Sequence, residues 1–530
     1  MYDDHFALVE DTVEFFAPVA TDAIAHLVAA YNAKRDAIIK LAQLLSGEYS
    51  QALGYFLQAS DQRSEFLLRT LNVERTIESL DAEYWSKALA LTDVMSIMPA
   101  ARRKQWNEQI MRWRNERPDP NTPPLPTFTD SVVRDLIGDL LSKRPQLFAE
   151  RIDGLFQSLS GGHLTNAPSG FSKRMILSGC FNEYGHVSNK SEFISDLRVV
   201  IAKFRGQVTE YRIDSTVVLR LAYKRRGEWI PVDGGAFRIR AYHVGTVHIE
   251  IHPEFAWRLN QALALLYTQA IPPQFRRRST KPLKKHELLE VPLSFELRSL
   301  LGTVKHHERP TTIYCPQSRG EDRFWKQAEA ILLSLGGEQI FKSMLFFSFD
   351  YDPLPVIQEI VVTGTLPDKV SHQFYPTNEV LARHAVDLLE ARDEDEILEP
   401  SAGQGGLAEL LPKEKVTCVE ISKLHCVILR QKGYRHVFEA DFLEWADARK
   451  GTFPRILMNP PYKDGQWKTH LRAAASLLSP GGRLVAILPA SAMRAAILPA
   501  GFSLEWHGPF ENQFDDTGVA VRLLVAVAPT

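Results

Sequence analysis

The stretch that decides the fold is DEILEPSAGQGGLAELL, at residues 395–411. Residues 395–400 are typical of a short strand, residues 401–406 form a glycine-rich turn, and residues 407–411 carry apolar residues at helical spacing. Glycine in such a turn lets the backbone approach a ligand closely, and a helix that follows it presents free amide donors. The stretch therefore predicts a strand, turn and helix that hold a small ligand.

The glycine pattern also disfavours one class of ligand. SAGQGG differs from the dinucleotide fingerprint GxGxxG, and no Gly-Lys-Ser or Gly-Lys-Thr follows it, as a P-loop would require. Those two motifs bind pyrophosphate through the backbone. A pyrophosphate ligand is therefore disfavoured.

Three further predicted strands end in residues that could bind a ligand or take part in a reaction. Strand 416–419 ends at Glu420, where such folds place an acid that binds both ribose hydroxyls. Strand 436–440 ends at Asp441-Phe442, and Ile456-Leu457-Met458 runs into Asn459-Pro460-Pro461-Tyr462. Each acid alone could be solvated, and NPP alone could be a turn, since proline excludes helix. Their order along the chain predicts a doubly wound α/β domain.

Residues from about 370 to 530 resemble the S-adenosylmethionine-dependent DNA adenine (N6) methyltransferases of the gamma arrangement, in which the cofactor motif precedes NPPY. The family's FYPTP element is matched by Phe374-Tyr375-Pro376-Thr377-Asn378, with Asn378 in place of the final proline. The resemblance implies an α/β fold of class I (Rossmann-like) with a mostly parallel seven-stranded sheet. It also implies S-adenosylmethionine as the cofactor.

The resemblance assigns a role to each matched residue. Asn459 and Pro460 would hold the target amine, with Pro461 and Tyr462 completing the motif and Tyr462 stacking on the target base. Phe514 or Phe510 would be a second aromatic clamp, although either could equally be a core side chain. The residues expected to bind the cofactor are Tyr375, Pro376, Thr377, Glu399, Ala402, Gly403, Gly405, Glu420, Asp441 and Phe442.

The expected chemistry is direct displacement. The exocyclic amine of adenine is a poor nucleophile because its lone pair is delocalised into the ring. If the Asn459 side-chain oxygen and the Pro460 carbonyl accept hydrogen bonds from the two N–H groups of this amine, the nitrogen becomes tetrahedral and its lone pair faces the donated methyl group. No metal site or Ser/His/Asp arrangement is visible in the sequence. A base in a duplex cannot reach such a pocket, so the nucleotide must be flipped out.

Length and composition set the broad class. A chain of 530 residues is long enough for two to four domains, and 45% hydrophobic with 24% charged residues is ordinary for a soluble protein. The N-terminus lacks the pattern of a secretory signal, and no apolar run reaches membrane-spanning length. The four cysteines have no CxxC spacing, which argues against zinc and disulfides and for free buried thiols. A cytoplasmic protein is expected.

Positive charge is concentrated outside the predicted catalytic domain. Residues 370–530 contain 17 Lys and Arg against 20 Asp and Glu, whereas residues 196–285 contain 17 against 7. Clustered positive charge favours phosphate binding through counterion release. The residues expected to contact DNA phosphates are Arg238, Arg240, Arg276, Arg277, Arg278, Lys281, Lys284 and Lys285.

The sequence predicts a division into four segments. Residues 1–117 are expected to be helical, and Pro-rich residues 118–126 to be a linker. Residues 127–365 form a basic α+β domain for DNA handling, with strands in 208–224 and 237–251, and residues 366–530 form the methyltransferase domain. The tryptophans of the first segment, Trp85, Trp106 and Trp113, are expected in a core or facing a partner.

Residues from about 130 to 365 also resemble a domain of unassigned function that accompanies adenine methyltransferases of phages and mobile elements. The resemblance rests on residues 147–177 and on GTVHIEIHPEFAWRLN at 245–260. Only 68 residues follow NPPY, so target recognition is expected upstream or weak, with short or relaxed sequence preference. Two alternatives stay open: an RNA amino-methyltransferase, and a DNA-binding or anti-restriction protein without activity. A restriction partner is not decided by the sequence.

Overall fold

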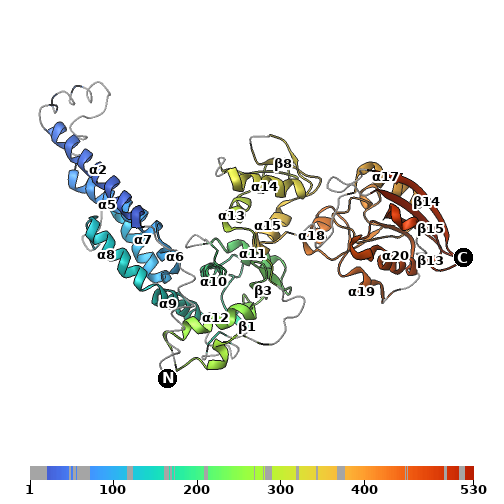
Figure 1. The fold of residues 1–530 in the computed structure, drawn as a ribbon, viewed down its shortest axis with the longest axis horizontal. Coiled ribbons are helices and arrows are strands. Elements are labelled where there is room, and N and C mark those ends of the chain that lie inside the picture. Colours follow the sequence, from blue (N-terminus) through green and yellow to red (C-terminus); the bar gives the residue numbers. More distant parts are fainter. Residues whose placement is uncertain are drawn as a thin grey trace. The chain divides into compact units, whose positions relative to one another are not determined.

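The computed structural model divides the chain into two compact units, Met1–Leu289 and Glu290–Thr530 (Figure 1). The structure describes residues 21–46, 49, 51, 55, 72–115, 123–159, 166, 170–171, 174–207, 213–267, 269–278, 280, 289–317, 322–341, 344–366, 377–447, 449, 452–494, 498–511 and 520–530.

The first unit begins with helices that share one apolar core. Trp85 is fully buried, donates its indole N–H to the Pro126 carbonyl at 2.7 Å, and meets Phe128 edge-on with ring centroids 5.2 Å apart. Trp106 and Trp113 pack partly buried against the same core, which confirms the core interpretation of the tryptophans. The helices are α2 (Thr21–Ser46), α5 (Val73–Ala90), α6 (Val94–Ile97), α7 (Ala100–Asn115), α8 (Asp130–Ser142) and α9 (Arg144–Gln157).

This shared core corrects one predicted boundary. Residues 118–126 were expected to separate two domains, but Phe128, Val133 and Ile137, which follow the stretch, are buried with Trp85, which precedes it. Helix α7 is described to Asn115, and it is followed in the sequence by prolines, which cannot continue a helix because proline has no amide hydrogen. Apolar burial on both sides then joins the helices into one body.

A four-stranded antiparallel sheet follows in the first unit, with strand order β1-β4-β3-β2. The alternation Phe237, Ile239, Ala241 buries one face of β3, as strand periodicity requires. Helices α10, α11 and α12 lie beside this sheet in Figure 1. The elements are β1 (Arg174–Leu177), α10 (Ser191–Phe204), α11 (Thr216–Lys224), β2 (Ile230–Val232), β3 (Phe237–Ala241), β4 (Val247–Ile251), α12 (Pro253–Leu263) and the 3₁₀ turn η1 (Pro273–Arg276).

The sequence prediction for this sheet was partly wrong. The strands expected within 237–251 are present as β3 and β4, whereas 216–224, expected as strand, forms helix α11. Its β-branched Thr216 and Val217 favour a strand locally. However, Val218, Leu219 and Ala222 are buried at helical spacing, and this tertiary burial outweighs the local preference.

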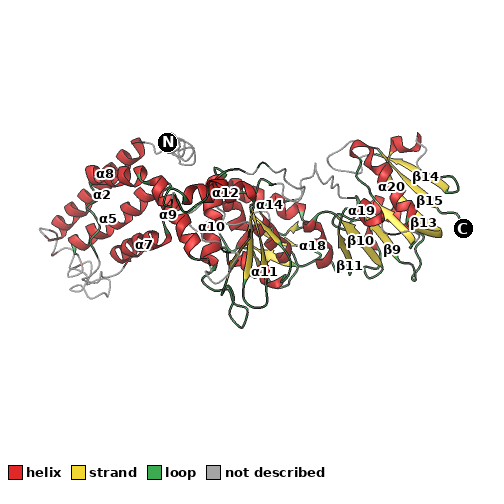
Figure 2. Ribbon diagram, turned by 90° about the horizontal axis from the view of Figure 1, so that it is seen from below, coloured by secondary structure: helices red, strands yellow, loops and turns green. Residues whose placement is uncertain are grey.

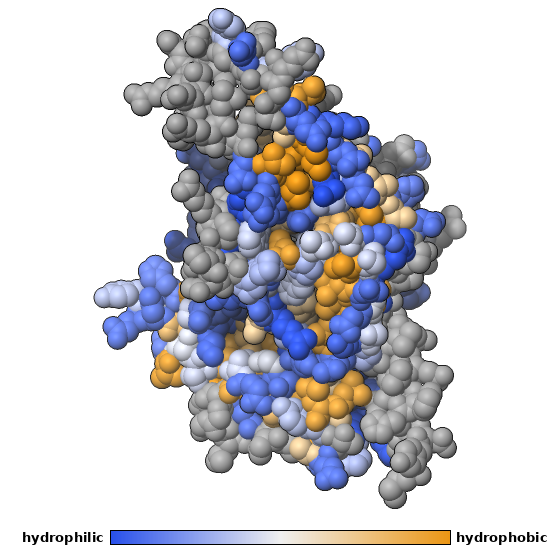
Figure 3. All heavy atoms as spheres, turned by 90° about the vertical axis from the view of Figure 1, so that its left-hand side faces the viewer, coloured by the Kyte–Doolittle hydropathy of each residue, from blue (hydrophilic) through white to orange (hydrophobic). Residues whose placement is uncertain are grey.

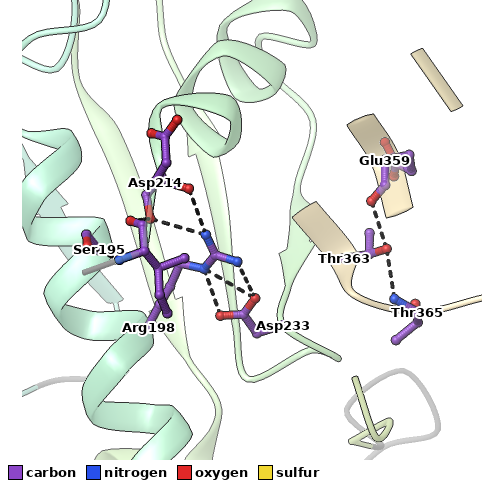
Figure 4. Close-up of polar contacts among 9 residues, drawn as sticks. Ser195, Arg198, Asp214, Asp233, Glu359, Thr363 and Thr365 are labelled. Carbon is purple, nitrogen blue, oxygen red and sulfur yellow. Dashed lines mark hydrogen bonds and ion pairs between the residues drawn. The ribbon is translucent and has the colours of Figure 1, made fainter. Parts of the chain in front are cut away.

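A buried ion pair fixes α10 to the sheet region of the first unit. Arg198, on α10, donates from Nε and Nη2 to the two carboxylate oxygens of Asp233, each at 2.9 Å (Figure 4). Its Nη1 donates to the Ser215 hydroxyl at 3.2 Å and to the Asp214 carbonyl at 3.3 Å. Both charged side chains are almost fully buried, so each needs the other to offset its lost hydration.

The second unit opens with a small α+β subdomain. Its sheet is antiparallel with strand order β5-β6-β8-β7, and Ile313 and Phe347 lie on its buried face. The elements are α13 (Phe295–Gly302), β5 (Lys305–His306), β6 (Thr312–Tyr314), α14 (Asp322–Ser334), β7 (Glu338–Gln339), β8 (Phe346–Ser348) and α15 (Leu354–Thr363).

The predicted boundary at 365 differs from the observed one at 289. The subdomain joins the following domain through Lys432, which pairs with Asp350 at 3.0 Å, and through Lys423, which pairs with Glu359 at 3.4 Å. Gln404, in the glycine loop, donates to the Ser334 carbonyl at 3.0 Å. These contacts link residues far apart in sequence, so they leave no local composition signal.

The remaining residues build a seven-stranded sheet with order β11-β10-β9-β12-β13-β15-β14. All neighbouring pairs are parallel except those that involve β15, which runs antiparallel to β13 and β14 (Figure 2). The strands are β9 (Ile397–Pro400), β10 (Val416–Glu420), β11 (His436–Glu439), β12 (Phe453–Met458), β13 (Leu478–Pro489), β14 (Ser503–Phe510) and β15 (Val521–Val527).

Helices cover both faces of this sheet. Alternate residues of β13 enter two cores: Val485 and Ile487 join α17 on one face, and Leu484 and Leu488 join α19 and α20 on the other. Each fully buried side chain of this size contributes about 1.5–3 kcal/mol. The helical elements are α17 (Glu379–Leu389), η3 (Ala408–Leu410), α18 (Lys423–Gln431), α19 (Phe442–Asp447), η4 (Lys463–Gly465), α20 (Gln466–Ser476) and η5 (Ala490–Arg494). The predicted doubly wound sheet is confirmed.

Two general expectations also meet the structure. All four cysteines are buried and free, as predicted. Among the described helices, none combines the length and the apolar character needed to cross a bilayer. Apolar side chains form separate patches among hydrophilic ones on the face drawn in Figure 3.

Candidate functional site

The candidate site lies where four parallel strands end. Strands β9, β10, β11 and β12 are consecutive neighbours in the sheet and run in the same direction, so their carboxyl ends meet at one edge. The order along the chain reverses between β9 and β12, since β10 continues on one side of β9 and β12 lies on the other. Ligands of open α/β sheets bind at such a switch point. The glycine loop and NPPY follow these two strands.

The glycine loop has left-handed backbone conformations. Gly403 has a φ of 56° and Gly405 a φ of 81°, and Ser401, which is not glycine, has a φ of 58°. A non-glycine residue in this region is strained, and such strain concentrates at functional sites. A Cβ at Gly405 would lie 2.9 Å from the Leu429 side chain. Packing within the protein therefore requires glycine at 405, whereas the sequence pattern had suggested that glycine is there to let a ligand approach the backbone.

The helix predicted after the loop is reduced to one turn. Residues 408–410 form the 3₁₀ turn η3, and the chain then extends to Pro412. Proline cannot continue the hydrogen-bond ladder, which leaves room for only three helical residues. The expected array of free amides at a helix start is therefore wrong for this chain.

Glu420 ends β10 and anchors the glycine loop. Its two carboxylate oxygens accept from the Gly403 and Ser422 backbone amides, each at 2.8 Å, and His425 Nδ1 lies 3.6 Å away. Burial raises the pKa of Glu420, but the nearby His425 ring and hydrogen bonds from the two amides outweigh burial and hold it below the usual value. Glu420 is therefore ionised at neutral pH. A carboxylate offers about four lone-pair positions, so it can still accept from a ligand.

Glu399, on β9, has the opposite ionisation. Burial, reinforced by the nearby Glu420 carboxylate, raises the pKa of Glu399 well above its usual value. The side chain is fully enclosed, and its Oε2 has no hydrogen-bond partner among the described residues. The site therefore combines a neutral carboxylic acid with an adjacent carboxylate.

This difference predicts a pH effect on stability. Above the usual pKa of 4.5, Glu399 is ionised in the unfolded chain but protonated in the folded one. Folding then takes up a proton, so stability falls by about 1.4 kcal/mol per pH unit until the raised pKa is passed. Glu399→Gln has no proton to take up and should lose this fall. Free energies of unfolding in urea, measured against pH for both proteins, test this; parallel curves would contradict the assignment.

Asp441 and Phe442 lie together at the end of β11. Asp441 Oδ1 accepts from the Leu443 amide at 2.8 Å and so caps α19, while Phe442 is buried in the core beneath it. His470, on α20, faces the same place: its ring lies 5.6 Å from the Phe442 ring, and its Nδ1 is 3.4 Å from the Ser401 hydroxyl. Burial lowers the pKa of His470, opposed by Asp441. Sequence reasoning missed His470, because no motif marks it.

Asn459 connects the two ends of the predicted site. Its Nδ2 donates to the Thr377 hydroxyl at 3.2 Å, and its Oδ1 accepts from the Tyr462 hydroxyl at 3.1 Å. Thr377 belongs to the segment matched to FYPTP, 82 positions earlier in the sequence. The two motifs thus meet in space. These contacts orient the amide so that its oxygen stands beside Tyr462.

The Tyr462 side chain is half-buried rather than exposed to solvent. Its hydroxyl also approaches the Ile487 carbonyl at 3.2 Å, and its ring packs against both cores of the sheet. Burial raises the pKa of this tyrosine, so it remains protonated. Pro460 is buried and Pro461 half-buried beside it.

The remaining predicted residues divide between the core, a helix cap and undescribed segments. Phe510 packs against the core and lies 5.5 Å from the His384 ring, so its surroundings match the core alternative. Asn378, where the family has proline, accepts from the Val380 amide at 2.9 Å and caps α17. Ala402 is buried in the loop. Tyr375, Pro376 and Phe514 lie outside the described residues.

Of the arginines expected at DNA phosphates, several have partners within the protein. Arg238 pairs with Glu250, Arg278 pairs with Glu254, and Arg276 donates to the Ile271 carbonyl. Arg277 is exposed. Lys281, Lys284 and Lys285 lie outside the described residues. Arg238 and Arg240 share one surface, the outward face of β3.

The described residues fit a cationic cofactor. S-adenosylmethionine carries a sulfonium and an ammonium group, and the ionised Glu420 and the acid Asp441 follow the neighbouring strands β10 and β11. The unpartnered Oε2 of buried Glu399 is a polar atom that a ligand can satisfy. Glu420 retains acceptor capacity for hydroxyl groups, as argued above.

A family of known proteins matches part of the first unit. The family described as "Domain of unknown function (DUF4942)" matches residues 77–269. This match supports the expected domain of unassigned function, but its bounds differ from the predicted residues 130–365. It begins earlier, at residue 77, and ends earlier, at residue 269. No curated protein matches the sequence.

Solved structures of methyltransferases are similar to part of the chain. TrmN from Thermus thermophilus is 20% identical, with a TM-score of 0.26, and the match covers 41% of this chain and 70% of that one. An rRNA methylase from Streptococcus thermophilus is 13% identical, with a TM-score of 0.23 and coverage of 28% and 95%. Magnesium protoporphyrin IX methyltransferase from Synechocystis, solved with bound SAM, is 16% identical, with a TM-score of 0.22 and coverage of 28% and 79%.

The strand order described above decides the fold. Residues 379–530 have the class I (Rossmann-like) methyltransferase fold. The C-terminal prediction is thereby confirmed. Its antiparallel strand β15 lies between β13 and β14.

Proposed function

We propose that this protein transfers a methyl group from S-adenosylmethionine to the exocyclic N6 amine of a flipped-out adenine in DNA. The observation that carries the proposal is the position of Asn459: it lies at the sheet's switch point, and Thr377 and Tyr462 fix its amide. Bound S-adenosylmethionine would supply an electrophilic methyl group on a positively charged sulfur. Glu399, Glu420 and Asp441 would hold it.

The chain's own residues account for activation of the amine. A carbonyl oxygen has two lone pairs, so Asn459 Oδ1 can accept one hydrogen bond from Tyr462 and one from the substrate amine. The Pro460 carbonyl is the second proposed acceptor. Two acceptors would draw both hydrogens to one side and direct the nitrogen lone pair toward the methyl group. The N–C bond would form as the S–C bond breaks, the sulfur would leave as a neutral thioether, and the methylated nitrogen would lose one proton to solvent. The resemblance of the sequence to the family's NPPY and FYPTP motifs favours adenine as the base.

DNA as partner is part of the proposal and rests on the sequence resemblance and the basic first unit. Phosphate contacts without a recognition helix hold DNA well but distinguish bases poorly. We therefore propose a short or relaxed sequence preference. An RNA substrate is the competing outcome.

The proposal is tested by supplying S-[methyl-³H]adenosylmethionine with duplex DNA, single-stranded DNA and total RNA in parallel. Label should enter DNA, and digestion to nucleosides should place it in N6-methyl-2′-deoxyadenosine. Sequencing with modified-base detection then gives the context, which should be short. Label confined to RNA, or a modified base other than adenine, would overturn the assignment.

Tyr462→Phe should separate the two roles of this tyrosine. The variant keeps a ring for stacking but removes the hydroxyl that orients Asn459, at 3.1 Å. Loss of one hydrogen bond of about 0.5–1.5 kcal/mol predicts a fall in kcat of about two- to tenfold, with KM for DNA nearly unchanged. Tyr462→Ala should also raise KM for DNA, because it removes the stacking surface as well. Equal kinetics for both variants would contradict these roles.

A further inference from the structure

The outward face of the four-stranded sheet in the first unit carries a row of charged residues. Arg238 and Arg240 alternate with the buried residues of β3 and therefore point away from the core. In the sheet register Glu250 on β4 lies between Arg238 and Arg174, while Arg240 lies opposite His248. This set of residues is called the arginine face.

One carboxylate serves two of these arginines. Arg174 donates from Nε and Nη2 to Glu250 Oε1, and Arg238 donates from the same atoms to Oε2, at 2.8 and 2.6 Å in each case. Burial raises the pKa of Glu250, but the two arginines outweigh this and lower it, so the carboxylate stays charged. Arg240 has no ion pair among the described residues. The arginine face therefore carries three guanidinium groups and one carboxylate.

Aromatic rings lie within the same face. The guanidinium carbons of Arg238 and Arg174 lie 4.8 and 5.7 Å from the centre of the Trp229 ring. Arg240 lies 5.3 Å from the centre of the Tyr242 ring, which is itself 4.4 Å from His248. Trp229 and Tyr242 are both partly exposed. Guanidinium planes and aromatic rings both offer flat surfaces to a nucleobase.

We propose that the arginine face binds single-stranded DNA, with phosphates at Arg238 and Arg240 and bases stacked at Trp229 and Tyr242. Excess positive charge on a sheet face complements a phosphate backbone. The aromatic rings select for unpaired bases, because the faces of bases in a duplex are covered by their neighbours. The choice of DNA over RNA rests on the function proposed above, whereas the binding itself needs no methyl transfer.

The test compares binding of fluorescein-labelled oligothymidylate, oligouridylate and a duplex by fluorescence anisotropy, using the full chain without S-adenosylmethionine. Arg238→Gln/Arg240→Gln should weaken oligothymidylate binding about tenfold and flatten its salt dependence, since phosphate contacts are lost. Trp229→Leu should weaken it about fivefold or more through lost stacking. Arg134→Gln is the matched control: this exposed arginine on α8 of the same unit should change binding less than twofold.

Glu250→Gln gives a test of opposite sign. Removing the carboxylate charge should tighten oligothymidylate binding severalfold if the face binds phosphates. Thermal melting of each variant shows whether it is folded. If the double arginine variant is unfolded, binding by Trp229→Leu tests the proposal instead. Unchanged binding in the arginine and Trp229 variants, or duplex binding as tight as that of the single strand, would overturn the proposal. Preference for oligouridylate would overturn the choice of DNA. If the unsubstituted protein binds oligothymidylate but transfers no methyl group to DNA, the proposed function alone would be overturned.

Discussion

Asn459→Ala should reduce methyl transfer about 10²- to 10³-fold, the usual cost of removing one group that stabilises developing charge in the reacting state. The substitution removes the oxygen proposed to accept from the substrate amine, together with the bonds to Thr377 and Tyr462. Asn459 is not among the acids proposed to hold S-adenosylmethionine, so calorimetric affinity for that cofactor should stay within about threefold. Single-turnover transfer of labelled methyl groups measures the chemical step.

Thr469→Ala is the matched control for this substitution. Thr469 is exposed on α20, which follows NPPY, and should leave both transfer and binding unchanged. If Asn459→Ala methylates DNA at the parental rate, the proposed activation of the amine is wrong. If it loses cofactor affinity as well, its role is to shape the pocket.

Glu420→Gln should have the second large effect. The Glu420 carboxylate accepts from the Gly403 and Ser422 amides, and glutamine would turn an NH₂ group toward one of them. A buried donor left without an acceptor costs about 1–3 kcal/mol, and more when a charged partner is lost. We therefore expect a lower melting temperature and about 10²-fold weaker binding of S-adenosylmethionine by calorimetry, since the glycine loop loses its anchor.

Glu399→Gln provides the comparison, because it changes a neighbouring acid in the same way. Burial and Glu420 keep Glu399 protonated, and an amide closely matches a neutral carboxylic acid in shape. Stability at neutral pH should therefore be kept or improved. If Glu399→Gln is as damaging as Glu420→Gln, the opposite ionisation of the two acids is incorrect.

The sequence predicts the parallel strands of the second unit and the residues at their ends best. Residues 397–400, 416–420, 436–439 and 453–458 form strands, as predicted. Strands β9 and β10 are buried along their whole length, which is typical of parallel strands covered on both faces, whereas β11 at the sheet edge is largely exposed. The acids and the NPPY motif lie at their ends because those positions are fixed by the strands. The prediction of buried cysteines was also correct.

Other features depend on contacts that local patterns do not record. Helix α11 forms in a segment rich in β-branched residues because burial of its apolar side chains outweighs their local preference. The Pro-rich stretch 118–126 lies within one folded unit because Trp85 and Phe128 meet across it. The sequence placed Arg238 on one face of a strand, but only the strand register shows that it shares the Glu250 carboxylate with Arg174.

The sequence by itself determined the order of strands, glycine turn and acids, since hydrophobic periodicity and backbone sterics act over a few residues. Only the tertiary structure decided that Thr377 meets Asn459, that Glu399 is neutral beside ionised Glu420, and that His470 faces Phe442. These properties depend on burial and on distances between side chains far apart in the chain. Burial and long-range distance are set by packing of the whole sheet, not by neighbours in sequence.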